Sequence, residues 1–166
     1  MIRTFLLTVA GTALTASTGA LAGKPGGEQI VHNGFQISRL SAEEQEVWRV
    51  IEAWNETFAA NDTEQYFQFI DDDITVMTPS NPYRVEGLSD DRVEFEFGLR
   101  LGYSRVGLFQ EIAPVVRVYG DTAFATYFKR GYYGSEEEGQ MIYLKETDIL
   151  RRKGERWKIV HIHVSK

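Results

Sequence analysis

The sequence predicts a single α+β domain in which helices come first and an antiparallel sheet follows. Apolar residues recur at helical spacing between residues 41 and 101, whereas residues 109–165 consist of strand patterns separated by short turns. Helices followed by a meander of strands is an arrangement typical of α+β proteins. At 166 residues, of which 43% are hydrophobic, the chain is long enough to bury one substantial core.

The first 22 residues predict a secretory signal peptide. Arg3 supplies the positive start, residues 4–14 form an apolar segment, and Ala20-Leu21-Ala22 fits a signal-peptidase site. We therefore expect a periplasmic or secreted protein, with a linker over residues 23–40 and a domain over residues 41–166. The absence of cysteine excludes thiol chemistry, and a net charge of −6 argues against nucleic-acid or membrane-surface binding.

The first helix is marked by a capping box. Ser41 is followed three residues later by Glu44, so each side chain can satisfy a backbone amide at the start of the helix. Apolar side chains then recur at helical spacing as far as Phe58. Asn61-Asp62 ends this helix and can cap a second, shorter one.

A short strand is expected from Ile74 to Thr78. The preceding Asp71-Asp72-Asp73 lacks the alternate spacing and the glycine of a calcium loop, so we expect a solvated turn there. A third helix follows, with Ser89 as its N-cap, and runs to about Leu101.

The second half of the domain consists of four strands in a meander. Gly120-Asp121 forms the first turn, and an acidic loop over residues 134–139 forms the second. Pro114 is tolerable only at a sheet edge or a bulge, because proline has no amide proton to donate. A curved sheet wrapped over helices forms a cone with a pocket inside. The four strands are expected at residues 109–119, 122–133, 140–152 and 157–165.

The last strand alternates without interruption, so parity separates its two faces. Val160, Ile162 and Val164 form an apolar row, which we expect to face the cone. The opposite row then belongs to the open face of the sheet and suits a half-buried, self-associating surface. That opposite row contains Trp157, Ile159, His161 and His163.

Residues 157–165, Trp-Lys-Ile-Val-His-Ile-His-Val-Ser, resemble the Trp-Gln-Ile-Val-His-Phe-His-Arg-Ser strand of the calcium/calmodulin-dependent protein kinase II association (hub) domain. Val85-Glu86-Gly87-Leu88 is similar to the segment before that family's third helix, and Glu146-Thr147 to the start of its Glu-Thr-Arg strand. The family belongs to the nuclear transport factor 2-like, SnoaL-like superfamily. The resemblance covers about residues 41–165. It implies a cone-shaped fold of three helices on a strongly curved antiparallel sheet, in a stand-alone bacterial-type relative that forms a dimer or a larger ring.

The family holds three arginines in its cone, and this chain differs at all three positions. Lys129 stands at the first position, Asp148 at the second and Val164 at the third. The cationic pocket that the resemblance implies is therefore largely absent from this chain.

Lys129, Glu146 and Asp148 are the residues that could carry chemistry in the cone. The resemblance places both carboxyls inside, where burial raises a carboxyl pKa unless a partner compensates, and it makes Lys129 that partner. Tyr127 and Tyr133 share the face of Lys129. Two interpretations stay open. Asp148 is a general base supported by its neighbours, or the charges form a structural network that fixes the register of the sheet.

His161 and His163 could hold a metal ion together with a third ligand. The only other histidine is His32 in the linker, and the chain has no cysteine, so we expect no metal site. Parity places the pair outside the cone, which favours a role in an interface.

Together these features predict an exported homo-oligomeric module, with a small-ligand-binding cone and no cofactor. Its expected partners are a second copy of itself and an unknown small molecule. The alternative is a SnoaL-like isomerase, dehydratase or cyclase with Asp148 as the base, and metal binding through the histidines is a third hypothesis. The expected pocket residues are Lys129, Glu146, Asp148, Tyr127, Tyr133, Val160, Ile162 and Val164.

Overall fold

A computed structural model of the chain describes residues 39–101, 105–134 and 139–166. The predicted signal peptide and nearly all of the predicted linker, including His32, lie outside the described residues. The helices are α2 (Ala42–Ala59), α3 (Thr63–Gln68) and α4 (Leu88–Arg100). The strands are β1 (Ile70–Met77), β2 (Val85–Glu86), β3 (Arg105–Tyr119), β4 (Thr122–Tyr133), β5 (Gln140–Lys153) and β6 (Arg156–Ser165).

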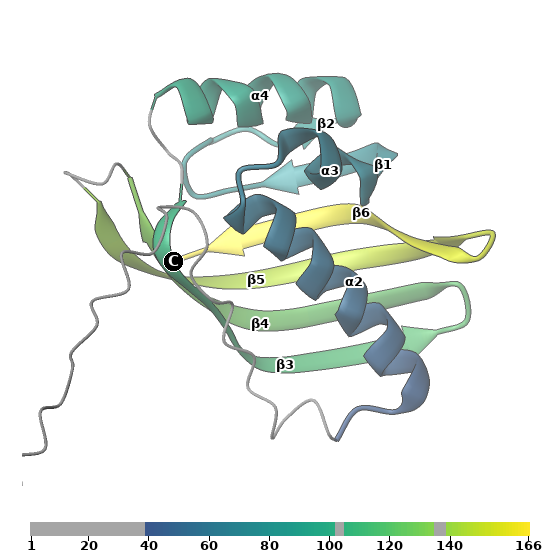
Figure 1. Cartoon of the computed structure of the whole chain (residues 1–166). Coiled ribbons are helices and arrows are strands. Elements are labelled where there is room, and N and C mark those ends of the chain that lie inside the picture. The colour runs from purple at the N-terminus through teal and green to yellow at the C-terminus, as the bar shows by residue number, and fades with distance from the viewer. Residues whose placement is uncertain (1–38, 102–104, 135–138) are drawn as a thin grey trace, which may run out of the picture.

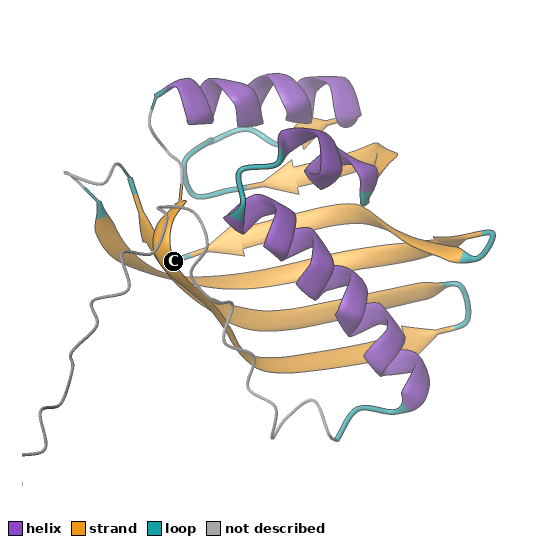
Figure 2. Cartoon of the chain, in the orientation of Figure 1, coloured by secondary structure: helices purple, strands orange, loops and turns teal. Residues whose placement is uncertain are grey.

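The six strands form one curved sheet in the order β2-β1-β6-β5-β4-β3. Neighbouring strands are antiparallel except for β1 and β6, the first and last strands of the chain, which lie side by side and run parallel. Helix α2 crosses one face of the sheet, and α4 lies over β1 and β2 (Figure 1, Figure 2). The predicted α+β cone is confirmed, and the parallel pair is the one departure from a purely antiparallel sheet.

The first two helices begin where the sequence predicts. Ser41 Oγ accepts from the amide of Glu44 at 3.2 Å, and the Glu44 carboxylate accepts from the amide of Ser41 at 2.9 Å. Asp62 caps α3 by accepting from the amide of Gln65 at 3.1 Å. These bonds satisfy amides that have no partner inside the helix, which fixes where each helix starts.

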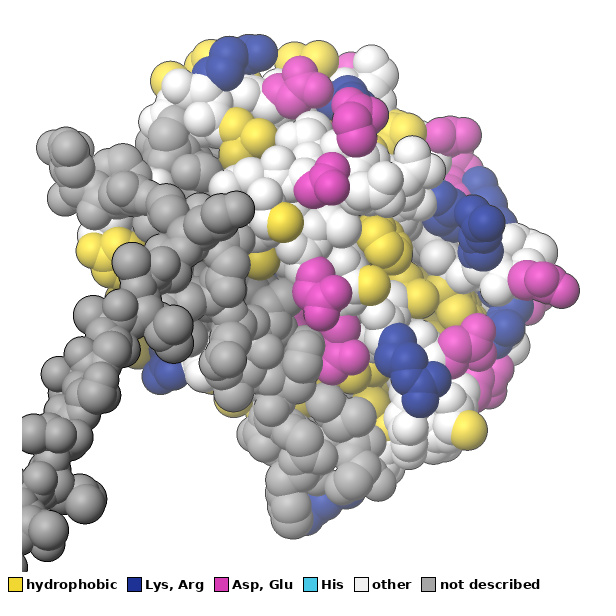
Figure 3. Space-filling view, viewed as in Figure 1, with side chains coloured by type: hydrophobic (Ala, Val, Ile, Leu, Met, Phe, Trp, Pro, Cys, Tyr) yellow, Lys and Arg dark blue, Asp and Glu magenta, His cyan; other side chains and the backbone are white. Residues whose placement is uncertain are grey.

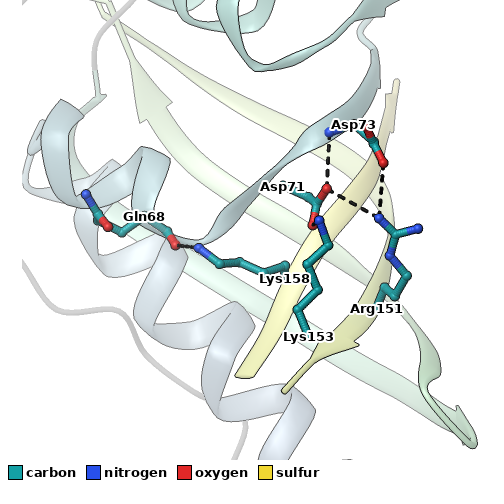
Figure 4. Close-up of polar contacts among 6 residues, drawn as sticks. All are labelled: Gln68, Asp71, Asp73, Arg151, Lys153 and Lys158. Carbon is teal, nitrogen blue, oxygen red and sulfur yellow. Dashed lines mark hydrogen bonds and ion pairs between the residues drawn. The ribbon is translucent and has the colours of Figure 1, made fainter. Parts of the chain in front are cut away.

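The predicted turn at residues 71–73 is wrong, because all three aspartates belong to β1. Asp71 is buried, and its carboxylate contacts Lys153 Nζ at 2.6 Å and Arg151 Nη2 at 3.4 Å on β5 (Figure 4). Arg151 also reaches Asp73 at 3.2 Å, and Lys158 on β6 donates to the carbonyl of Gln68. The two β5 cations allow a buried carboxylate where composition alone suggested a solvated turn.

Helix α4 begins two residues earlier than predicted. Gly87, not Ser89, is the N-cap, and its φ of 87° lies in a region that favours glycine. The amide of Gly87 donates to the carbonyl of Ile74 at 2.7 Å, which ties the start of the helix to β1. Ser89 therefore falls inside the first turn.

Two β-bulges change which side chains face the cone. In β3 the register shifts between Ile112 and Val115, around Ala113 with a φ of 57°, and Pro114 lies within this bulge on an edge strand, as predicted. In β6 the partner of Ile149 is His161 and the partner of Leu150 is Ile159, so Val160 is an extra residue. Each bulge reverses the inward and outward alternation of its strand.

The core lies between α2 and the concave face of the sheet. Val47, Trp48, Ile51 and Trp54 of α2 are buried against Ala123, Ala125 and Leu150 of the sheet, among other residues. The small alanines on β4 leave room for the tryptophans above them. No helix in the described ranges is long and apolar enough to cross a bilayer.

Candidate functional site

The cone is organised around the hydroxyl of Tyr127. This oxygen lies 2.8 Å from Glu146 Oε1, 2.8 Å from Asp148 Oδ2 and 3.2 Å from Asn55 Nδ2, and all four side chains are buried. Tyr127 pairs with Glu146 across β4 and β5, and Asp148 is two residues further along the same face. The register of two strands therefore places one phenol between two carboxyl groups.

Lys129 and Glu146 form an ion pair inside the cone. Lys129 Nζ lies 2.5 Å from Glu146 Oε2, and the two side chains are 6% and 0% exposed. The ammonium also lies 5.2 Å from the ring of Trp54, 5.7 Å from Phe58 and 5.7 Å from Tyr127. Burial is the largest single effect and opposes the charge on Lys129, but Glu146 and the other acidic groups of the cone together outweigh it, so the pKa of Lys129 is raised.

The hydrogen bonds around Tyr127 require a proton on one carboxyl group. Asn55 donates to the phenolic oxygen, and the phenol has one proton, which can bond only one of the two carboxyls at 2.8 Å. The other carboxyl must therefore be protonated and donate its own proton to the phenolic oxygen. Since Glu146 is paired with Lys129, the protonated group is Asp148.

The electrostatics of the cone agree with a neutral Asp148. Burial raises the pKa of Asp148 well above its usual range, and the charge on Glu146 raises it further against the opposing effect of Lys129. Burial is the largest effect on Tyr127 as well and raises its pKa, and the charge of Glu146 adds to the increase. The cone therefore holds a carboxylic acid and a phenol at neutral pH, in contact with one ion pair.

Glu111 and Asn55 belong to the cone, although the sequence analysis did not select them. Glu111 is 1% exposed and pairs with Lys129 across β3 and β4, and its charge contributes to the raised pKa values of Tyr127 and Asp148. The bulge around Pro114 turns Glu111 inward, and Pro114 was the feature of the sequence that could have indicated this change of face. Asn55 lies within the apolar stripe of α2, next to Trp54, and a polar residue at such a position could have indicated a buried hydrogen bond.

The remaining predicted pocket residues divide into two groups. Ile162 is buried, Val164 packs against the core, and Tyr133 is half-buried near Phe58 with 6.4 Å between the ring centroids. Val160 was placed in the pocket incorrectly, because it is the extra residue of the β6 bulge and is not part of the core cluster.

The predicted interface row of β6 is split by the same bulge. Trp157 and Ile159 are 3% and 0% exposed, so their placement on the open face is wrong. They precede the bulge and therefore face the core, whereas His161 and His163 follow it and face outward. Both histidines thus remain on the open face of the sheet, as parity predicted.

The histidines lie beside β1 on this open face. Thr75 Oγ1 and His161 Nδ1 are 2.7 Å apart, and the ring centroids of His161 and His163 are 6.5 Å apart. Burial lowers the pKa of His161, and His163 and Arg84 lower it further. Within residues 39–101, 105–134 and 139–166, no group of three or more His, Cys, Asp or Glu side chains could hold a metal ion.

Two hollows open on the surface of the described chain. One of about 250 Å³ lies between the segment 77–84 and the end of β6, and is lined by Arg84 and His163 among others. The other, of about 340 Å³, is mostly apolar and is lined by Phe128, Lys129 and Tyr143, among others. Neither hollow is lined by Asp148.

Comparison with known protein families identifies the family to which this domain belongs. The sequence profile of the calcium/calmodulin-dependent protein kinase II association domain matches residues 43–166, which is most of the chain. The chain belongs to this association-domain family. No match was found among curated protein sequences.

Solved structures share the fold of this association domain. A nuclear transport factor 2-like protein of unknown function from Pseudomonas putida is 24% identical with a TM-score of 0.66, over 75% of this chain and 86% of its own. The association domain of the C. elegans kinase is 23% identical with a TM-score of 0.62, over 75% of this chain and 96% of its own. A hub homology domain from Chlamydomonas reinhardtii is 23% identical with a TM-score of 0.61, over 75% and 98%.

Proposed function

We propose that this association domain is an exported module that assembles with copies of itself through the open face of its sheet, and that its cone takes a small ligand. Membership of the association-domain family supports self-assembly. The observation that carries the proposal is the set of large apolar side chains exposed on the face opposite α2. These are Met77, Val115, Tyr119, Phe128, Met141 and Tyr143, which are 40–67% exposed.

The pairing of the strands puts these side chains on one continuous surface. Phe128 pairs with Lys145, Met141 with Tyr132, and Val115 with Thr126, all at positions whose neighbours along each strand point into the cone. The apolar hollow lined by Phe128 and Tyr143 lies in this region. A surface of exposed aromatic and aliphatic side chains is typical of a protein interface rather than of a monomer.

A larger ring needs a second surface, and α4 supplies a candidate. Val93, Phe97 and Leu101 recur at intervals of four residues and are 64%, 53% and 58% exposed. Hydrophobic side chains show along the top of the molecule, where α4 lies, interspersed with acidic and basic ones (Figure 3). This stripe faces away from the sheet, so it can join dimers without competing with the open face.

Light scattering on residues 23–166 at micromolar concentration tests the assembly. We expect a dimer or a larger closed assembly, and Phe128→Glu should reduce its mass because a carboxylate would be buried in the interface. Phe97→Glu is a matched control, since Phe97 on α4 is 53% exposed and Phe128 is 51% exposed. It should retain the dimer even if it limits larger assemblies. A wild-type monomer, or a mass that Phe128→Glu leaves unchanged, contradicts the proposal.

Export is tested separately with the full chain in a bacterial host. The apolar segment after Arg3 and the Ala20-Leu21-Ala22 site support it. We expect the protein in the periplasmic or secreted fraction with a new N-terminus near Gly23. Recovery of uncleaved protein from the cytoplasm contradicts this part of the proposal.

The enzymatic alternative is less well supported by the geometry. A general base must be ionised and must be reached by substrate. Asp148 carries the proton in the hydrogen bonds around Tyr127, and its side chain is fully buried and exposes no surface to a substrate.

A further inference from the structure

The side chain of Lys129 ends in a cage that suits an ammonium ion. Three aromatic rings, from Trp54, Phe58 and Tyr127, lie within 5.2–5.7 Å of Nζ, and Glu146 contacts it at 2.5 Å. Aromatic faces attract a cation through the negative charge density of the ring, and several faces around one cation are the arrangement that recognises quaternary ammonium ligands. The lysine therefore occupies a site whose walls select for positive charge.

The rest of the cone also presents acceptor oxygens that lack a hydrogen-bond donor. Glu111, Glu146 and Asp148 are three buried carboxyl groups around one lysine. Asn55 Oδ1 and Asp148 Oδ1 are buried and accept no hydrogen bond from any residue that the structure describes. Asn55 is itself fully buried and bonded to Tyr127, so its orphaned oxygen is an observation independent of the carboxyl groups. A ligand with several N–H donors would satisfy these atoms.

We propose that the cone is a binding site for a primary alkylammonium group, and that the chain fills this site with the ammonium of its own Lys129. The inference rests on the ligand-binding part of the proposed function, because it names the chemical class that the cone selects and that the side chain of Lys129 supplies in the wild-type chain. It predicts that the cone accepts a free alkylammonium ion once the lysine side chain is removed, and that it rejects anions of the same size.

Chemical rescue of Lys129→Ala tests the proposal. This substitution removes Cγ, Cδ, Cε and Nζ, which together correspond to n-propylammonium. We expect Lys129→Ala to melt several degrees below wild type, and millimolar n-propylammonium to raise its melting temperature by at least about 3 °C. n-Propanol and propionate, which have the same length but no positive charge, should raise it by less than half as much.

Lys145→Ala is the matched control, because Lys145 is an exposed lysine on the outer face of β5. It should not respond to n-propylammonium more than wild type does. Equal rescue of Lys129→Ala by n-propanol would overturn the proposal, because it would show an apolar cavity rather than an ammonium site. No rescue by any of the three compounds would overturn it as well.

A second variant covers the case in which Lys129→Ala does not fold. The chain has no cysteine, so Lys129→Cys carries a unique thiol. Alkylation of the unfolded chain with 2-bromoethylammonium forms one S–C bond, releases bromide and restores an ammonium at lysine length. We expect this product to refold, and the iodoacetamide product, which is neutral, to refold with at least tenfold lower yield. Equal yields would overturn the proposal.

The mass of each refolded variant separates this inference from the assembly proposal. Selective rescue without assembly would contradict only self-association, whereas assembly without selective rescue would contradict only the ammonium site.

Discussion

The hydroxyl oxygen of Tyr127 lies 2.8 Å from Asp148 Oδ2, at the centre of the cone and out of contact with water. Glu146 Oε1 lies at the same distance from this oxygen, so one phenolic proton faces two carboxyl groups. The contact with Asp148 is favourable only when the aspartic acid keeps its proton. The predictions for the interior of the cone follow from this relationship.

Replacing Tyr127 with phenylalanine should destabilise the domain. The change removes the group that separates two buried carboxyls, and leaving such groups unsatisfied costs about 1–3 kcal/mol. Urea unfolding followed by circular dichroism measures the loss. Tyr143→Phe is the control, since Tyr143 is 64% exposed and its hydroxyl should matter by less than about 0.5 kcal/mol. Equal effects of the two substitutions would contradict the role of Tyr127.

Asparagine should replace Asp148 better than alanine does. The amide of asparagine can donate to Tyr127 as the protonated acid does, so Asp148→Asn should keep wild-type stability at pH 7 or exceed it. Asp148→Ala should lose about 1–3 kcal/mol, because it leaves the phenol without that partner. Thermal unfolding of the two variants gives the comparison. A larger loss for Asp148→Asn than for Asp148→Ala would show that the native residue is a carboxylate.

Asp91 on α4 should make the domain less stable as the pH rises. Burial, together with the charge of Glu94, raises the pKa of Asp91 to about 7, from an ordinary value of 3.8. The folded state therefore binds more protons than the unfolded state between these two pH values, and the free energy of unfolding falls as pH rises through that window.

Asp91→Asn removes this dependence. The variant should match wild type below about pH 4 and be more stable by about 4 kcal/mol at pH 8, as measured by urea unfolding. Asp90→Asn, an exposed neighbour in the same turn, should not change the pH profile. A wild-type stability that is flat between pH 4 and 7 would refute the assignment.

Asp71 on β1 should have the opposite effect. Burial is the largest single effect and opposes its charge, but the hydrogen bonds from Lys153 and the amide of Asp73, together with the charges of Lys153 and Arg151, outweigh burial, and the pKa of Asp71 is lowered. Its contribution is therefore present above the unfolded pKa and is lost as the pH falls through the folded pKa. Asp71→Asn should cost about 1–2 kcal/mol at pH 7, a modest value because both cations are half-exposed, and less at pH 2–3.

Asp73→Asn is the control for Asp71, because the side chain of Asp73 is 75% exposed although it contacts the same arginine. Its substitution should change the free energy of unfolding by less than about 0.5 kcal/mol. If Asp73→Asn costs as much as Asp71→Asn, the buried position of Asp71 has no special importance.

Most of the fold could be predicted from the sequence because its local signals are strong. The capping box at Ser41, the turn at Gly120-Asp121 and the alternation of β5 each determine one element. The inward row of Glu146 and Asp148 was predictable for the same reason, since β5 keeps its register with β4 from end to end. Local pattern and tertiary structure agree at these places.

The two bulges account for most of the features that could not be predicted from the sequence. Val160 inverts β6 after an uninterrupted alternation, so no local signal marks the change that buries Trp157 and Ile159. Pro114 indicates a bulge in β3, but the sequence does not show at which residue the register shifts. The side of the sheet that Glu111 faces depends on that position. The buried position of Asp71 depends on cations eighty residues away in β5. Such effects arise from pairing between distant strands.

The distance between copies across the sheet tests the central claim of self-assembly most directly. Because the chain has no cysteine, a single spin label can be placed at Lys145→Cys on the open face or at Glu56→Cys on the exposed side of α2. Double electron–electron resonance should give a defined distance for both labels in the assembled protein, with the shorter distance at residue 145. A shorter distance at residue 56, or no dipolar coupling at either position, would contradict assembly through the open face.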